Sequence, residues 1–154
     1  MPVSPKESAG QLLGVMPLVM RAVRAEMRSH RTLGLSVPQF RALAFTHRHP
    51  GASLSAGAEH IGVTLPTMSR LVDGLVKRKL VVRRSHPGDR RRITLDLTAQ
   101  GQALWQTAYD FTHASMTKQL SGLTGSQCAA VSKAMHILFR LFAPGMTHEG
   151  PSDS

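Results

Sequence analysis

Nine basic side chains are concentrated between residues 70 and 92, and they are the most distinctive chemical feature of the sequence. Two carboxylates, Asp73 and Asp89, oppose them there, so nine positive and two negative charges give this window a formal charge of +7. A concentrated run of Lys and Arg is typical of surfaces that bind phosphate groups. We call these residues the basic stripe: Arg70, Lys77, Arg78, Lys79, Arg83, Arg84, Arg90, Arg91 and Arg92.

The basic stripe falls on two predicted elements that follow each other directly. Residues 64–79 predict an amphipathic helix, with Thr64 as its N-cap and Pro66 in its first turn. Residues 80–84 and 93–97 predict two strands that flank a turn at residues 86–89, where Pro and Gly stand. A basic helix followed by a basic hairpin indicates a winged helix-turn-helix that binds DNA, whereas a merely well-solvated surface is the plainer alternative.

Five more helices are predicted around this helix and hairpin. Apolar residues recur at steps of three and four along residues 8–31, with Pro17 inside the pattern. Ser36 and Gln39 form a capping-box pattern at the start of the next helix, and Gly62 closes a short one over residues 53–61. The last two helices should begin at Thr98 and at about Ser126. The predicted fold class is mainly α with a small β wing, comprising six helices and a two- to three-stranded antiparallel hairpin.

Composition narrows the class of protein further. The single cysteine, Cys128, excludes a disulfide within the chain and fits a reducing cytoplasm. No run approaches the roughly 20 apolar residues of a membrane span, so no membrane partner is expected, and the first ten residues lack the order of a signal peptide. Residues 144–154 are polar and rich in Gly, Pro and Ser, which predicts a flexible tail. No nucleophile elbow, paired carboxylates, metal motif or phosphate-cradling loop occurs, so we expect neither an enzyme nor a cofactor.

Several stretches resemble the MarR (multiple-antibiotic-resistance regulator) family of bacterial winged helix-turn-helix transcription regulators. They are residues 63–75, Leu80-Val81, residues 88–92 and the run from Leu97 to Gly101, and the similarity extends over about residues 12–142. Asp89 and Arg91 match the Asp-x-Arg signature of the family's wing. Two positions depart from the family pattern. Gly57 replaces a usual leucine, which should weaken its helix by about 1 kcal/mol and remove a core contact, and His86-Pro87 stands where acidic residues are common.

The resemblance implies a sequence-specific DNA-binding transcriptional regulator, a repressor that a small-molecule effector releases from a pseudo-palindromic operator. Residues 8–143 would form one domain, with a DNA-binding lobe at 33–98. Residues 8–31 and 99–143 would pair two copies into a homodimer. The dimer-interface candidates, which could equally fill an intramolecular core, are Leu12, Val15, Val19, Val131, Leu138 and Phe142.

Double-stranded DNA is therefore the expected partner. Arg70 is the favoured base-reading residue, because a guanidinium can bond guanine bidentately, and a salt bridge to Asp73 is its alternative. Arg91 is expected in the minor groove, Asp89 should orient Arg91 or a neighbour by an ion pair, and the other wing arginines should hold the backbone. The candidates on the helix are Thr64, Pro66, Thr67, Ser69, Arg70 and Lys77, and those on the wing are Arg83, Arg84, Asp89, Arg90, Arg91 and Arg92.

The sequence also contains candidate residues for an effector pocket and for a redox sensor. A small aromatic effector could bind among Met16, Met20, Met27, Phe40, Trp105 and Tyr109, although ordinary core packing explains each of them as well. Cys128 could act as a redox sensor, but a buried, inert thiol is the commoner case. The eight histidines are scattered, so no metal site is expected. A nonspecific architectural DNA-binding protein, and an interaction module that binds no DNA, remain the competing functions.

Overall fold

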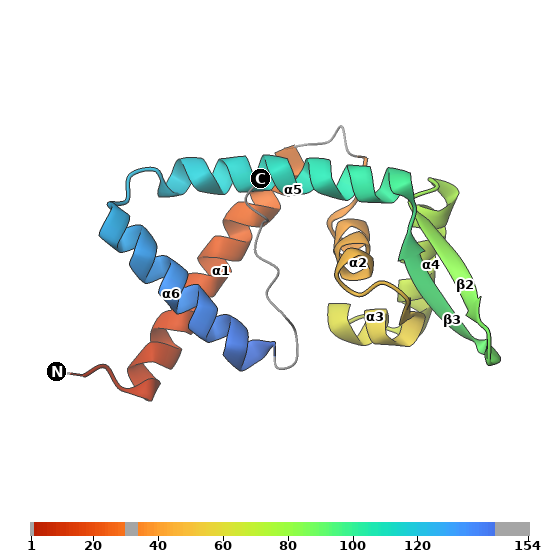
Figure 1. Ribbon diagram of the computed structural model, residues 1–154, viewed down its shortest axis with the longest axis horizontal. Helices are drawn as coiled ribbons and strands as arrows, with labels where there is room; N and C mark the ends of the chain where they lie inside the picture. The colour runs from red at the N-terminus through yellow and green to blue at the C-terminus, as the bar shows by residue number, and fades with distance from the viewer. Residues whose placement is uncertain (1, 30–33, 144–154) are drawn as a thin grey trace. The chain divides into compact units, whose positions relative to one another are not determined.

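The computed structural model describes residues 2–29 and 34–143 (Figure 1). Within these residues the chain forms six α-helices and three β-strands, as the sequence predicts. The helices are α1 (Pro5–Ser29), α2 (Val37–Arg48), α3 (Leu54–Ile61), α4 (Leu65–Lys77), α5 (Ala99–Leu120) and α6 (Gly125–Phe142). The strands are β1 (Ala52–Ser53), β2 (Val81–His86) and β3 (Asp89–Leu97).

The starts of α2, α3 and α4 are fixed by the caps that the sequence predicts. The Ser36 side chain accepts the Gln39 N–H at 3.2 Å, and the Gln39 amide oxygen accepts the Ser36 N–H at 3.1 Å, which completes a capping box. Ser53 caps α3, and Thr64 caps α4 by accepting the Thr67 N–H. Each cap satisfies a backbone donor that the first helical turn leaves unpaired, so a local sequence signal is enough to place it.

The three strands form one antiparallel sheet in the order β1-β3-β2. The hairpin β2–β3, called the wing below, pairs Arg83 with Leu95, and its register shifts between Ser85 and His86. β3 begins at Asp89, four residues before the predicted strand, so Arg90, Arg91 and Arg92 belong to the strand. β1 adds a short third strand through its pairing of Ala52 with Leu95.

The core of the helix-turn-helix lies where α2, α3 and α4 meet the base of the wing (Figure 1). Its fully buried side chains include Leu43, Met68, Leu75 and Leu95. Gly57 is buried in α3, and a Cβ added there would lie 2.6 Å from Met68 Cε and 3.1 Å from Phe45 Cε1. Met68 and Phe45 therefore fill the space of the missing leucine. The expectation that Gly57 removes a core contact is wrong for this reason.

The start of α5 is held tightly against the backbone at the end of α4. Thr98 donates its hydroxyl to the Lys79 carbonyl at 2.6 Å and accepts the Gly101 N–H at 2.9 Å. A Cβ on Gly101 would lie 2.0 Å from the Leu80 carbonyl oxygen. Glycine is therefore required by this close approach of two backbones.

Several predicted boundaries shift by a few residues. α1 starts at Pro5, before the predicted residue 8, and contains Pro17. α4 ends at Lys77, because Lys79 adopts a left-handed conformation with φ of 59°. α6 begins at Gly125, one residue before the predicted start, and Thr124 is its N-cap. The chain forms two compact units that divide between Ser115 and Met116, within α5. The predicted end of the first helix and the predicted tail at 144–154 lie outside the described residues.

Candidate nucleic-acid interface

Helix α4 buries one side and presents the other to solvent. Met68, Val72 and Leu75 face the core, while Pro66, Arg70 and Lys77 lie on the exposed side. Thr64 is also exposed at the N-cap, and Thr67 is half-buried. The positive dipole end of the first turn favours an anion close by.

Arg70 is not paired with Asp73. The Asp73 carboxylate instead forms an ion pair with Arg83, which comes from strand β2. Within the part of the chain that the structure describes, Arg70 is exposed and makes no ion pair or hydrogen bond with another side chain. The alternative role of Arg70 as a helix salt bridge is therefore wrong, and its guanidinium is available to a ligand.

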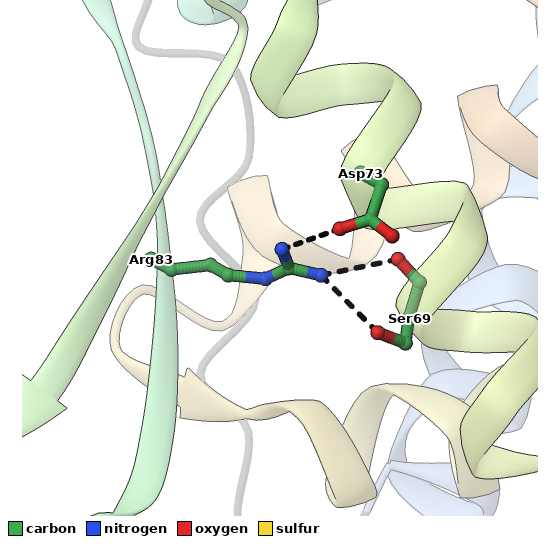
Figure 2. A network of polar contacts seen from close by, with 3 residues as sticks. All are labelled: Ser69, Asp73 and Arg83. Atoms are coloured by element: carbon green, nitrogen blue, oxygen red, sulfur yellow. Dashed lines mark hydrogen bonds and ion pairs between the residues drawn. The ribbon is translucent and has the colours of Figure 1, made fainter.

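Figure 2 shows how Arg83 ties the wing to α4. Its Nη1 donates to Asp73 Oδ1, and its Nη2 donates to the Ser69 carbonyl at 3.1 Å and to Ser69 Oγ at 3.3 Å. The Arg83 side chain is 30% exposed and that of Asp73 is 48% exposed. Three of the contacts that a guanidinium can make are thus spent inside the protein. The role predicted for Arg83 at the DNA backbone stays a prediction. The structure shows that its side chain links the wing to α4.

The remaining wing arginines are displayed outward. Arg90, Arg91 and Arg92 are exposed along the start of β3. Arg84 is 68% exposed, and its Nε lies 3.4 Å from Asp96 Oδ2. These side chains keep most of their hydrogen-bonding capacity for a partner outside the chain.

Asp89 acts on the backbone of the wing tip. Its Oδ1 accepts the Arg91 N–H at 2.9 Å, the short local bond that Asp side chains make in turns. Close by, the Gly88 N–H donates to His86 Nδ1 at 3.2 Å. No ion pair of Asp89 with Arg91 or a neighbouring arginine is found among the described residues, so the expected ion pair is wrong, and Asp89 instead accepts the main-chain N–H of Arg91.

A groove of about 400 Å³ separates the start of α4 from the wing. Apolar side chains from α3, α4 and β3 contribute to it, together with serines and charged residues of the wing. Its lining, called the α4–wing groove below, is Ser53, Leu54, Ser55, Leu65, Asp89, Arg91, Arg92 and Ile93. Sequence reasoning did not select Leu65 or Ile93. The available signal was that Leu65 falls outside the buried stripe of α4.

Ring contacts join α2 to α5. His47 stacks on Trp105 with ring centroids 3.6 Å apart, and Trp105 stacks on Tyr109 at 5.1 Å. His47 Nδ1 also lies 2.9 Å from the Gln102 amide oxygen. Of the six predicted effector-pocket residues, the structure brings Trp105 and Tyr109 together. Met16 and Met20 are exposed, and Met27 and Phe40 are half-buried, so the pocket stays a prediction.

A second ring cluster involves Phe45, His49 and His60. His60 lies 5.1 Å from the Phe45 ring and 5.8 Å from the His49 ring, measured between centroids. Desolvation lowers the pKa of His60, and the nearby charges of His49, Arg48 and Arg41 lower it further. The neutral imidazole is therefore favoured beside this basic surface.

Each terminal helix carries exposed apolar side chains. Neither α1 nor α6 contains a buried residue. Among the predicted dimer-interface residues, Val15, Val19, Val131 and Phe142 are exposed, and Leu12 and Leu138 are half-buried. The assignment of these residues to a dimer interface or to an intramolecular core stays a prediction. Cys128 is exposed, so the expectation of a buried thiol is wrong for the single chain.

Two features are absent from residues 2–29 and 34–143. No group of three or more His, Cys, Asp or Glu side chains there is arranged to hold a metal ion. None of the helices in those ranges combines the length and the apolar character that a membrane span requires.

A helical core, an exposed basic helix and a basic antiparallel hairpin together define a winged helix-turn-helix protein. Comparison with known proteins agrees: a model of the MarR family matches residues 33–92. The HTH-type transcriptional repressor MdtR of Bacillus subtilis is 28% identical over 148 residues, which cover 93% of this chain and 94% of that protein. The HTH-type transcriptional repressor Mb2911 of Mycobacterium bovis is 32% identical over 95 residues, covering 62% of this chain and 68% of that protein.

Solved structures share the same architecture. A MarR-family transcriptional regulator from Silicibacter pomeroyi superposes with a TM-score of 0.66 at 26% identity, covering 88% of this chain and 90% of that one. The structure of RV1404 from Mycobacterium tuberculosis shares the fold with a TM-score of 0.74 at 20% identity, covering 92% and 95%. The chain belongs to the MarR family of transcriptional regulators.

Proposed function

We propose that this protein is a homodimeric repressor that binds a pseudo-palindromic DNA operator. The observation that carries the proposal is the exposed Arg70 on the outer face of α4, which pairs with no carboxylate among the described residues, beside the exposed Arg90, Arg91 and Arg92 of the wing. The repressor names of the MarR-like relatives support the same activity.

In the proposed complex, the first two turns of α4 enter the major groove as a recognition helix. The positive dipole end of α4 faces phosphate, and Arg70 reaches base edges, where a guanidinium bonds guanine bidentately. Lys77, near the end of the helix, contacts the phosphate backbone. Phosphate contacts supply affinity, and base contacts supply sequence choice.

The wing extends the contact to the neighbouring minor groove. Arg91 enters it, because a narrow A·T-rich minor groove has an enhanced negative potential. Arg84, Arg90 and Arg92 hold the adjoining phosphates. Through Asp73 and Ser69, Arg83 sets where the wing stands relative to the recognition helix.

Two copies are needed to read a full operator. The uncovered apolar side chains of α1 and α6 support pairing, because large exposed apolar patches mark association surfaces. A two-fold dimer places its recognition helices on half-sites roughly one helical turn apart. Release by a small aromatic effector completes the proposed cycle, and the stacked Trp105 and Tyr109 are its candidate contacts.

Selection from random DNA duplexes, with sequencing of the bound fraction at near-physiological salt, tests the proposal. Enrichment of a pseudo-palindrome is expected. Tight binding without enrichment would instead show an architectural DNA-binding protein, and no binding would favour an interaction module. The enriched duplex also provides the probe for effector screening.

A further inference from the structure

Two side chains break the pattern of burial around the helix-turn-helix. Every residue from Gly34 to Ala108 is described, and large apolar side chains in this range are buried or half-buried with two exceptions. Leu65 is 48% exposed and Ile93 is 37% exposed. Both line the α4–wing groove.

Leu65 is not needed to build the start of α4. Thr64 already caps the helix, and Val63 packs against the core cluster that contains Met68, the contact by which a hydrophobic staple fixes a helix entry. Leu65 is absent from the side chains that pack on this core. The Leu65 side chain therefore stabilises neither the cap of α4 nor the core.

The position of Leu65 relates it to the wing. Leu65, Ser69 and Asp73 are spaced four residues apart, so they lie on one ridge of α4. Ser69 and Asp73 are bonded to Arg83 of the wing, and Leu65 is the open end of that ridge. Arg91, Arg92 and Asp89 border the same groove, so an apolar side chain stands within a charged rim with two positive groups and one negative group.

An apolar side chain surrounded by charged groups can match the major-groove edge of a DNA base pair, which presents both polar and apolar groups. The major groove presents hydrogen-bonding atoms and one apolar group, the C5-methyl of thymine, and aliphatic side chains contact that methyl. Leu65 lies in the first turn of α4, the part of a recognition helix that meets base edges. Ile93 belongs to the wing, and the minor groove to which a wing reaches presents no thymine methyl.

We infer that Leu65 is a specificity-determining residue that reads the methyl group of one thymine in each operator half-site. The inference rests on the proposed function, since it requires α4 to enter the major groove. It adds an apolar contact to the hydrogen bonds of Arg70.

Replacement of thymine by deoxyuridine tests the inference, because it removes the methyl group and leaves the hydrogen-bonding pattern unchanged. Each thymine of the selected duplex is replaced singly, and the Kd of the full-length protein is measured. At one position per half-site, affinity should fall about fourfold, the worth of one buried methyl-sized group, and about 15-fold when both half-sites are changed.

The variants separate Leu65 from its surroundings. Leu65→Ala should bind the thymine and deoxyuridine duplexes equally at that position, while Leu65→Met should retain the dependence on the methyl group. Ile93→Ala is the matched control, since it truncates the other exposed apolar side chain of the groove. This variant should lose as much affinity as the parent protein when deoxyuridine replaces the thymine. Equal melting temperatures of Leu65→Ala and the parent protein show that the fold is intact.

The outcomes are distinguishable. Indifference of the parent protein to deoxyuridine at every thymine overturns the inference, as does a full loss retained by Leu65→Ala, and both leave the proposed function standing. If selection enriches no duplex, the proposed function is wrong and the inference falls with it.

Discussion

Arg83 and Asp73 join the wing to the recognition helix, with the guanidinium of one on β2 and the carboxylate of the other on α4. The same guanidinium also bonds to Ser69, one turn earlier on the helix. One side chain thus bridges the two DNA-reading elements. Because the pair is partly screened from solvent, its loss should affect both stability and geometry.

Arg83→Ala and Asp73→Ala should each lower the free energy of unfolding by roughly 1–2 kcal/mol, measured by urea denaturation. Both should weaken operator binding and leave the dependence of log Kd on log salt unchanged, because the Arg83 guanidinium is bonded to Asp73 and Ser69 within the protein. Arg84→Ala is the control: it should lower that slope by about one and barely change stability. A slope reduced by Arg83→Ala as much as by Arg84→Ala would identify Arg83 as a phosphate contact.

Arg70→Ala should cost roughly 1–3 kcal/mol of operator binding and relax the preference at one base pair, because it removes a base-reading contact. Lys77→Ala, on the same exposed side of α4, should weaken binding to all sequences about equally and reduce the salt slope. Repeated selection with each variant measures both effects. If the two variants enrich the same operator as the parent protein, Arg70 reads no base.

Local signals predicted most of the helix starts. Ser36, Ser53 and Thr64 act within three residues of themselves, so the sequence alone places the caps that the structure contains. The partner of Asp73 could not be predicted in this way. Arg70 is three residues away on the same helix, whereas Arg83 is ten residues away, and the choice depends on how the hairpin packs against α4.

Packing across elements explains the other differences. Gly57 looked like a defect in α3, because the sequence does not show that Met68 and Phe45 occupy the vacant space. Leu65 was overlooked because its significance lies in its exposure, which depends on where the wing stands. The prediction that Cys128 is buried was wrong. Apolar neighbours in the sequence do not ensure that other elements of the same chain pack over that face of the helix.

Asp89 should contribute to DNA binding through the shape of the wing tip. Asp89→Asn keeps an oxygen that can accept the Arg91 N–H, and it removes a negative charge near phosphate. This variant should bind the operator at least as tightly as the parent protein. Asp89→Ala loses the acceptor, so it should bind about fivefold more weakly than Asp89→Asn. Equal affinities of the two variants, measured by fluorescence anisotropy, would mean that the turn is formed without the Asp89 side chain.

Gly101 should tolerate no side chain, although it lies in a helix where alanine is intrinsically favoured by about 1 kcal/mol. A Cβ would meet the Leu80 carbonyl oxygen at 2.0 Å, and two backbones must separate to admit it. Gly101→Ala should therefore destabilise the fold by roughly 1–3 kcal/mol, the usual cost of overpacking, and lower the Tm. Gly10→Ala is the matched control within α1, where no atom lies within 4 Å of the added Cβ, and it should not lower the Tm. A Gly101→Ala protein that melts at or above the parent temperature would show that the start of α5 can move away from Leu80 without cost.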